Sequence, residues 1–282
     1  MIKITDPAHF AAIVKDFQKQ HPKAATNCFL MPAEISSLAA GGKIAVLPQD
    51  DALLVLCERP GYYNIYYYIA QDAQSPDFSQ ALAAAGENEV LIDVVVPKRL
   101  QDKTDPVLQR MLDAGAIKPY KSYMRMSYPL AGKTTADYNW LLPEGYRLAE
   151  TLPDPNSILD LWKLSLDEKS TPLPEPDMIK RIYDEGTLFC IVDQTGELAC
   201  AAMLNVEGNH ALIQHISVSK LHKRNGLALC AMKMCVGLAV KLGVKTLRLW
   251  VDRANYPAIA LHEKTGFTQD GMICYQYMIE RK

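Results

Sequence analysis

The feature that most constrains the fold is an apolar segment over residues 226–242, in which Lys233 and Lys241 are the only charged residues. Its length predicts a helix, and a helix that is apolar on all sides must be buried within the protein. The segment falls short of the ~20 apolar residues that cross a bilayer. Apolar strands are expected on either side of it, at residues 211–218 and 245–251. This strand–helix–strand pattern predicts a sheet with helices packed on its faces.

The length of the chain and one polar segment predict two domains. The 282 residues fit two domains of about 130–150 residues each. Residues 129–145 are rich in the Pro, Gly, Lys, Thr and Asp that are typical of connecting segments. We therefore expect a first domain over residues 1–132, a linker over residues 133–145 and a second domain over residues 146–282. Both are expected to be of the mixed α/β class, each with a mixed, mostly antiparallel sheet flanked by helices.

The two halves share an order of expected elements that suggests an internal duplication. In each half an apolar strand, beginning near Glu89 and near Val244, precedes a short helix, a glycine and a tyrosine-containing strand. The match is weak residue by residue. Two unrelated α/β domains are therefore the alternative interpretation.

Charge and cysteine content argue against several classes of function. The formal net charge is −2, which provides no field for gripping nucleic acid or an anionic membrane. The seven cysteines are odd in number and include no C-x-x-C pair, so we expect neither disulfides nor a metal site. The N-terminal residues lack the basic-then-apolar order of a signal peptide. These features predict a cytoplasmic protein in a reducing environment.

A basic loop before the apolar helix is the candidate binding element. The loop ends with Lys223, Arg224, Asn225 and Gly226. The first turn of a helix has unpaired N–H groups and a partial positive charge, which together suit an anion. A glycine at this point has no Cβ that would block the approach of a phosphate. An ordinary turn with a solvated basic face is the alternative interpretation.

These residues resemble the acetyl-CoA loop of the GNAT superfamily of N-acetyltransferases. That loop reads Q/R-x-x-G-x-G/A between a strand and a helix, and this chain has Lys223-Arg224-Asn225-Gly226-Leu227-Ala228. A second family pattern, N-x-x-A-x-x-L-Y-x-K-x-G-F, lies downstream. It is matched, except that histidine replaces the tyrosine, by Asn255, Ala258, Leu261, His262, Lys264, Gly266 and Phe267. The resemblance covers residues 146–282, and the first half lacks both patterns, as a degenerate GNAT-like copy would.

The resemblance implies an acetyl-CoA site between the strand and the helix, with acetyl-CoA as acyl donor. Backbone groups of the strand would pair with the pantetheine arm, and amides at the start of the helix would receive the diphosphate. An asparagine at the start of the next helix would lie near the pantetheine. The residues implied are Ile216, Ser217, Val218, Lys223, Arg224, Asn225, Gly226, Leu227, Ala228, Leu229 and Asn255.

Two histidines are the candidate catalytic residues. Acyl transfer to an amine needs a proton acceptor for the amine, stabilisation of the carbonyl oxygen and a proton for the leaving thiolate. A tyrosine often donates that proton in this family, and His262 stands in its position, so we interpret His262 as the general acid. His215, on the strand that borders the acyl site, is the candidate base or holder of a water molecule. For each of them a purely structural histidine is the alternative.

The sequence as a whole predicts an acetyl-CoA-dependent N-acetyltransferase that transfers the acyl group directly to a small-molecule or amino-acid-like amine. We expect no nucleic-acid or membrane partner. The sequence leaves open whether the chain forms a homodimer. A non-catalytic module that binds acyl-CoA is the main alternative. An aminoacyl-transferring enzyme on the same fold is a third, against which the diphosphate loop argues.

Overall fold

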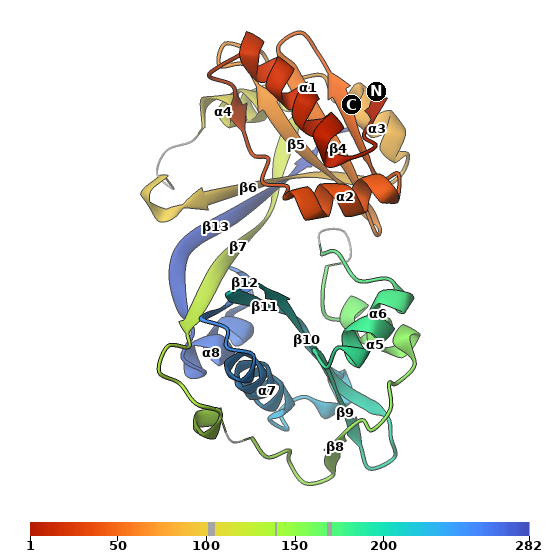
Figure 1. The fold of residues 1–282 in the computed structure, drawn as a ribbon, viewed down its shortest axis with the longest axis vertical. Helices are drawn as coiled ribbons and strands as arrows, with labels where there is room; N and C mark the ends of the chain where they lie inside the picture. Colours follow the sequence, from red (N-terminus) through yellow and green to blue (C-terminus); the bar gives the residue numbers. More distant parts are fainter. Residues whose placement is uncertain (101–104, 139, 168–170, 282) are drawn as a thin grey trace. The chain divides into compact units, whose positions relative to one another are not determined.

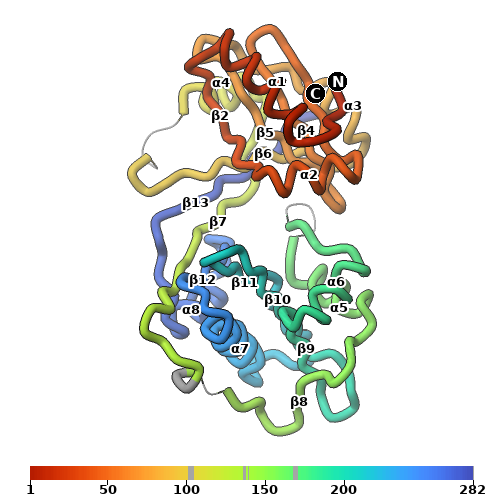
Figure 2. Tube along the Cα trace, viewed as in Figure 1, coloured from red at the N-terminus to blue at the C-terminus, as the bar shows by residue number. Residues whose placement is uncertain are grey.

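The computed structural model describes residues 1–100, 105–138, 140–167 and 171–281. The chain forms two compact units (Figures 1 and 2). Unit 1 comprises Met1–Ser122 together with Ile273–Lys282, and unit 2 comprises Tyr123–Met272. This division is not linear along the chain, because the long strands β7 (Ile117–Pro129) and β13 (Thr268–Ile279) each contribute residues to both units.

Unit 1 is a mixed sheet with helices on both faces (Figure 1). Its strands follow the order β1-β3-β4-β5-β6-β13. The pairs from β1 to β5 are antiparallel, whereas β5 and β6 are parallel. The bounds are β1 (Ile2–Lys3), α1 (Pro7–Gln20), β2 (Ala25–Thr26), α2 (Pro32–Ala40), β3 (Ile44–Pro48), β4 (Ala52–Arg59), β5 (Tyr62–Ile69), α3 (Ser79–Ala85), β6 (Glu89–Pro97), η1 (Lys98–Leu100) and α4 (Pro106–Asp113).

The tyrosine-rich strand β5 supplies side chains to both cores of unit 1. Adjacent strand residues point to opposite faces. Tyr66 and Tyr68 therefore pack under α1 and α2, while Tyr67 packs under α3 and α4. Tyr66 and Tyr67 are each 2% exposed, so these rings are core residues and do not line a surface.

Unit 2 has the same layered construction. Its strands follow the order β7-β12-β11-β10-β9-β8. The strands β8 to β11 form antiparallel pairs, β11 and β12 are parallel, and β12 pairs antiparallel with Tyr123–Pro129 of β7. The bounds are η2 (Thr135–Tyr138), β8 (Tyr146–Leu148), α5 (Pro155–Lys163), α6 (Pro176–Asp184), β9 (Leu188–Asp193), β10 (Leu198–Glu207), β11 (His210–Val218), η3 (Lys220–His222), α7 (Leu227–Lys241), β12 (Thr246–Asp252) and α8 (Tyr256–Lys264).

The apolar helix α7 is the centre of the larger core of unit 2. Met232, Cys235 and Ala239 of this helix are fully buried against the sheet. Helix α8 contributes Ile259 and Leu261 to the same face, while α5 and α6 cover the opposite face. The prediction that α7 is buried within a layered α/β unit is confirmed.

The two units repeat one order of elements. Three antiparallel strands are followed by a helix, a parallel strand and a second helix, as β3-β4-β5-α3-β6-α4 in unit 1 and as β9-β10-β11-α7-β12-α8 in unit 2. The mixed α/β class with helices on both faces of each sheet agrees with the class predicted from the sequence.

Some local elements differ from the expectations drawn from sequence. The segment 133–138 and 140–145, expected to be a linker, lies in unit 2, and Tyr138, Trp140 and Leu142 pack against its core. Strand β3 and helix α2 were not expected from the sequence. Within the described ranges, every helix is too short or too polar to span a membrane.

Candidate active site

The candidate site lies where two parallel strands of unit 2 separate. Residues His210–Leu212 of β11 pair with residues Thr246–Arg248 of β12. The pairing stops there, although β11 continues to Val218 and β12 to Asp252. The N–H of Ser219 bonds to Ala199 on the opposite neighbour β10. Because peptide groups alternate in direction along a strand, those of Ile216 and Val218 face the gap left by β12. The gap therefore offers strand-like hydrogen-bonding groups to a linear ligand.

The end of β11 leads directly to the start of α7. Gly226 is the N-cap residue with φ +77°, a left-handed conformation that glycine adopts without strain. No side chain among the described residues caps this end of the helix, so the amides of its first turn keep their hydrogen-bonding capacity. Lys223 and Arg224 beside it are exposed, and Leu227 is 1% exposed and anchors the first turn in the core. A rigid, positively polarised helix start thus adjoins the gap.

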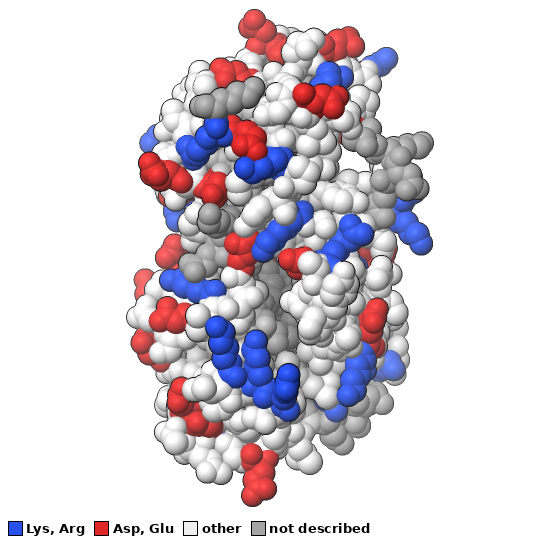
Figure 3. Space-filling view, turned by 180° about the vertical axis from the view of Figure 1, so that it is seen from behind, with Lys and Arg blue, Asp and Glu red and all other residues white. Residues whose placement is uncertain are grey.

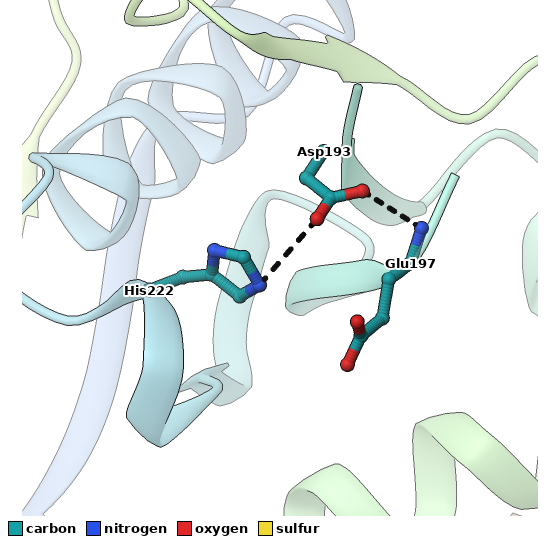
Figure 4. A group of neighbouring side chains, drawn as sticks. All are labelled: Asp193, Glu197 and His222. Atoms are coloured by element: carbon teal, nitrogen blue, oxygen red, sulfur yellow. Dashed lines mark hydrogen bonds and ion pairs between the residues drawn. The ribbon is translucent and has the colours of Figure 1, made fainter. Parts of the chain in front are cut away.

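A chain of polar side chains fastens this loop to its neighbours. The Asn225 amide donates to the Tyr146 hydroxyl at 2.7 Å, and that hydroxyl lies 3.0 Å from Nδ1 of His222. Since the Tyr146 oxygen accepts from Asn225, its own proton is available for Nδ1 of His222. The proton of a neutral His222 ring is then on Nε2, which lies 3.9 Å from Oδ2 of Asp193 (Figure 4). The loop is therefore tied to strand β8 and to the β9–β10 turn.

Asp193 itself is held by the turn that follows β9. Its Oδ1 accepts from the backbone N–H groups of Thr195 and Glu197 and from the Thr195 hydroxyl. These bonds, with the hydroxyl bond as the largest contribution, hold the pKa of the Asp193 carboxyl below its usual range. Asp193, Glu197 and His222 offer ligand atoms within 4.8 Å of one another. Because one Asp193 oxygen is already engaged by the turn and the other faces His222, we assign these three residues a structural role.

His215 occupies a strained point of β11 on the α5 side of the sheet. Its φ is +54°, and β11 has an irregular register with β10 between Ala201 and Met203. Its ring lies 5.1 Å from the Trp162 ring of α5. Burial lowers the pKa of His215 from 6.5 to about 4, and a hydrogen bond with the Pro172 backbone opposes part of that shift. The ring is therefore neutral at pH 7, and it borders the part of β11 that faces the gap.

His262 lies on α8, which packs against the opposite face of the sheet. Its ring centroid is 6.2 Å from that of Phe267, and its Nδ1 is buried with no hydrogen-bond partner among the described residues. Burial lowers the pKa of His262 from 6.5 to about 4. The ring is therefore neutral at pH 7, and its Nδ1 is an unsatisfied buried polar atom.

Asn255, which the resemblance implies near the pantetheine, also has a structural role. Asn255 is the N-cap of α8 and accepts from the Ala258 N–H at 3.2 Å. The loop residues Lys223 to Leu229 are contiguous at the start of α7, whereas His215 and His262 come from different elements and make no ring contact with each other. The sequence did not predict the roles of Tyr146 and Asp193. Each lies about thirty residues or more before the loop, and no local pattern connects it to the loop.

The surface charge agrees with a small, local anion site. On the face drawn in Figure 3, basic and acidic side chains are mixed over the upper part, whereas several basic side chains lie beside one another near the middle of the lower part. Such a face has no broad field of one sign, in keeping with the formal net charge of −2.

The part of the chain that contains these residues is similar to known proteins. Residues 156–267 match the Acetyltransferase (GNAT) family. The [ribosomal protein bS18]-alanine N-acetyltransferase of Escherichia coli K12 is 34% identical over 76 residues, which are 27% of this chain and 51% of that protein. The chain thus spans about half the length of this curated relative.

Solved structures share the fold over nearly the whole chain. A GCN5-related N-acetyltransferase from Sphaerobacter thermophilus has a TM-score of 0.57 and 14% identity, with 95% of this chain and 90% of that chain covered. A tandem GNAT protein from the clavulanic acid biosynthesis pathway has a TM-score of 0.56 and 14% identity, with 99% and 90% covered. The splayed strands and the open helix start lie within residues 156–267, the part of the chain that matches the Acetyltransferase (GNAT) family.

Proposed function

We propose that this chain is an N-acetyltransferase that uses acetyl-CoA and transfers the acetyl group directly to an amine. The observation that carries the proposal is the continuous path from the gap between β11 and β12 to the uncapped start of α7. The backbone of Ile216–Val218 would hold the pantetheine arm, and the amides from Arg224 to Leu229 would hold the diphosphate. Asn255 would lie near the pantetheine, and Lys223 would add positive charge at the mouth of the site.

The chemistry requires one bond to form and one to break. The neutral amine attacks the thioester carbonyl carbon, the C–S bond then breaks, the amine loses a proton and the CoA thiolate gains one. Alignment of amine and thioester within the gap would supply much of the rate. No metal is needed for this sequence of steps.

The two histidines would handle the protons. A neutral His215 can accept a proton from the amine, directly or through a water molecule, because its lowered pKa keeps it unprotonated at pH 7. His262 would donate to the thiolate. Since its pKa is lowered to about 4 in the free protein, the developing negative charge on sulfur must raise that pKa for the proton to be in place.

The acceptor would approach from the side of α5 and α6. The backbone of Pro172 hydrogen-bonds to His215. Pro172 belongs to residues 167–177, the acidic, proline-rich segment that connects these helices. Residues 168–170 of this segment lie outside the described residues. We propose this segment as the determinant of acceptor choice. The relative from Escherichia coli is named for an alanine of a ribosomal protein, so alanyl peptides belong beside small amines and free amino acids among the candidates.

We further propose that unit 2, which contains most of residues 146–282, carries the acetyltransferase function and that unit 1, which contains most of residues 1–132, is a degenerate GNAT-like copy. The free state of all seven cysteines is in keeping with a cytoplasmic protein.

Release of free CoA thiol from acetyl-CoA, measured with an amine panel, tests the function. Turnover with at least one amine is expected, and binding of acetyl-CoA without thiol release from any amine would favour the non-catalytic module. His262→Phe should lower kcat by at least about tenfold if the ring donates the proton, since proton donation typically contributes 10²–10⁴-fold. Full turnover by a folded variant would exclude that role.

A further inference from the structure

Unit 1 contains the same separation of parallel strands as unit 2. Residues Tyr62–Ile65 of β5 pair with residues Glu89–Ile92 of β6. Beyond these pairs β5 continues to Ile69 and β6 continues to Pro97. A gap equivalent to that between β11 and β12 would open beyond Ile65. In unit 1, however, the chain itself fills it.

The side chain of Asn27 bridges the two strands at this point. Its Oδ1 accepts from the backbone N–H of Tyr67 at 2.7 Å, and its Nδ2 donates to the carbonyls of Ile65 at 3.4 Å and Asp93 at 2.9 Å. One amide group thus accepts from β5 and donates to β5, as a peptide unit of a neighbouring parallel strand would. Asn27 is 9% exposed, so water does not compete for these bonds.

The rest of the open edge of β5 is also occupied. Ala25 and Thr26 of strand β2 pair antiparallel with Ile69 and Tyr68. The Thr26 hydroxyl accepts from the N–H of Cys28 at 3.0 Å and fixes the turn on which Asn27 lies. Among the described residues of unit 2, no side chain bridges β11 and β12 in this way.

The turn before the helix that follows β5 holds a carboxylate beside the first residue of that helix. Asp77 accepts from the N–H of Ser79, the first residue of α3, at 2.8 Å and from its hydroxyl at 2.8 Å. The backbone bond, as the largest contribution, holds the pKa of the Asp77 carboxyl below its usual range. The segment from Ile69 to Ser79 carries Asp72 and Asp77 and no Lys or Arg, whereas the loop before α7 carries Lys220, Lys223 and Arg224. The segment before α3 therefore lacks the positive charge of the loop before α7 and carries negative charge instead.

We propose that unit 1 is a self-filled version of the same binding fold, in which Asn27 takes the place of a pantetheine amide, so that the chain binds a single coenzyme A, in unit 2. The comparison with pantetheine depends on the proposed function of unit 2. The closure of unit 1 stands on the contacts of Asn27 and of strand β2 alone.

Calorimetric titration of the full chain with coenzyme A tests the stoichiometry. One equivalent is expected, and it should be lost in Gly226→Asp, which sets a carboxylate at the start of α7 as Asp77 does at α3. Two equivalents, of which one survives in Gly226→Asp, would overturn the inference and leave the proposed function intact. If one equivalent still binds to Gly226→Asp, the coenzyme does not bind at the start of α7, and both the inference on unit 1 and the proposed function of unit 2 are overturned.

Amide hydrogen exchange at Tyr67 tests the closure without any ligand. In the wild-type chain this amide should be protected, and coenzyme A should not change its exchange rate. Asn27→Ala should raise the rate at least tenfold, whereas Asn88→Ala, at an exposed asparagine of the same unit, should not. Rapid exchange of Tyr67 in the wild-type chain would overturn the inference. If no coenzyme A binds but Tyr67 is protected, the closure stands and the proposed function fails.

Discussion

The replacement of Gly226 by alanine separates the binding role of the helix start from its contribution to stability. Gly226 has φ +77°, and a Cβ built on it meets no atom within 4 Å. An alanine there is strained by about 1–2 kcal/mol in the left-handed region but does not clash with the protein. Gly243, just beyond the other end of α7, provides a matched control, because it has φ +71° and equally open surroundings.

Gly226→Ala and Gly243→Ala should therefore lose similar free energies of unfolding, about 1–2 kcal/mol each. Only the Cβ at position 226 points into the space where a diphosphate would approach the amides of α7. Loss of one charge-assisted hydrogen bond, about 1.5–3 kcal/mol, should raise the Kd for coenzyme A in Gly226→Ala by roughly 10–100-fold. Urea denaturation and calorimetric titration measure the two effects. If both variants bind coenzyme A equally well, the anion site is not at the start of α7.

Three further outcomes are expected. Asn27→Ala removes three hydrogen bonds of a side chain that is 9% exposed and should lower the free energy of unfolding by about 2–4 kcal/mol. Asn88→Ala removes a single hydrogen bond, to the Ala85 carbonyl, and should lower it by about 0.5–1.5 kcal/mol; equal losses in urea denaturation would contradict this account. The pKa of His215 is lowered to about 4, so the unfolded chain binds the extra proton and stability should fall as pH drops from 6.5 to 4, by on the order of 3 kcal/mol. In His215→Gln that part of the pH dependence should vanish, and an unchanged profile would refute the burial of the ring. The isolated fragment 146–282 lacks Tyr123–Pro129, which pairs with β12, and should show no cooperative thermal unfolding, whereas the full chain should; a cooperative transition in the fragment would show that this strand is dispensable.

The sequence predicted the parts of the site that are contiguous in the chain. The end of β11, the basic loop and the apolar helix α7 form one segment, and each has a local signature in hydrophobicity, charge or glycine placement. The cap formed by Asn255 is local in the same sense. Such features depend on neighbours within a few residues, which is the range that a pattern can report.

The parts that the sequence did not predict depend on distant partners. Tyr146 meets His222 and Asn225 only because the fold brings β8 beside the loop. Asn27 is one polar residue in an irregular segment, and its role comes from β5 and β6, which follow about forty and sixty residues later. The lowered pKa of His262 likewise results from burial that its own helix does not reveal.

The long strands β7 and β13 have a consequence for biosynthesis. Residues 273–279, at the end of β13, complete the sheet of unit 1, where Gln276 donates to Asp93 at 2.9 Å and Ile279 is 4% exposed. These residues follow every other element of unit 1 in the sequence, and the whole of unit 2 lies between them and the rest of that unit. During synthesis the edge of β6 therefore stays unpaired until unit 2 and residues 273–279 have been made, so the first unit to begin is completed after the second.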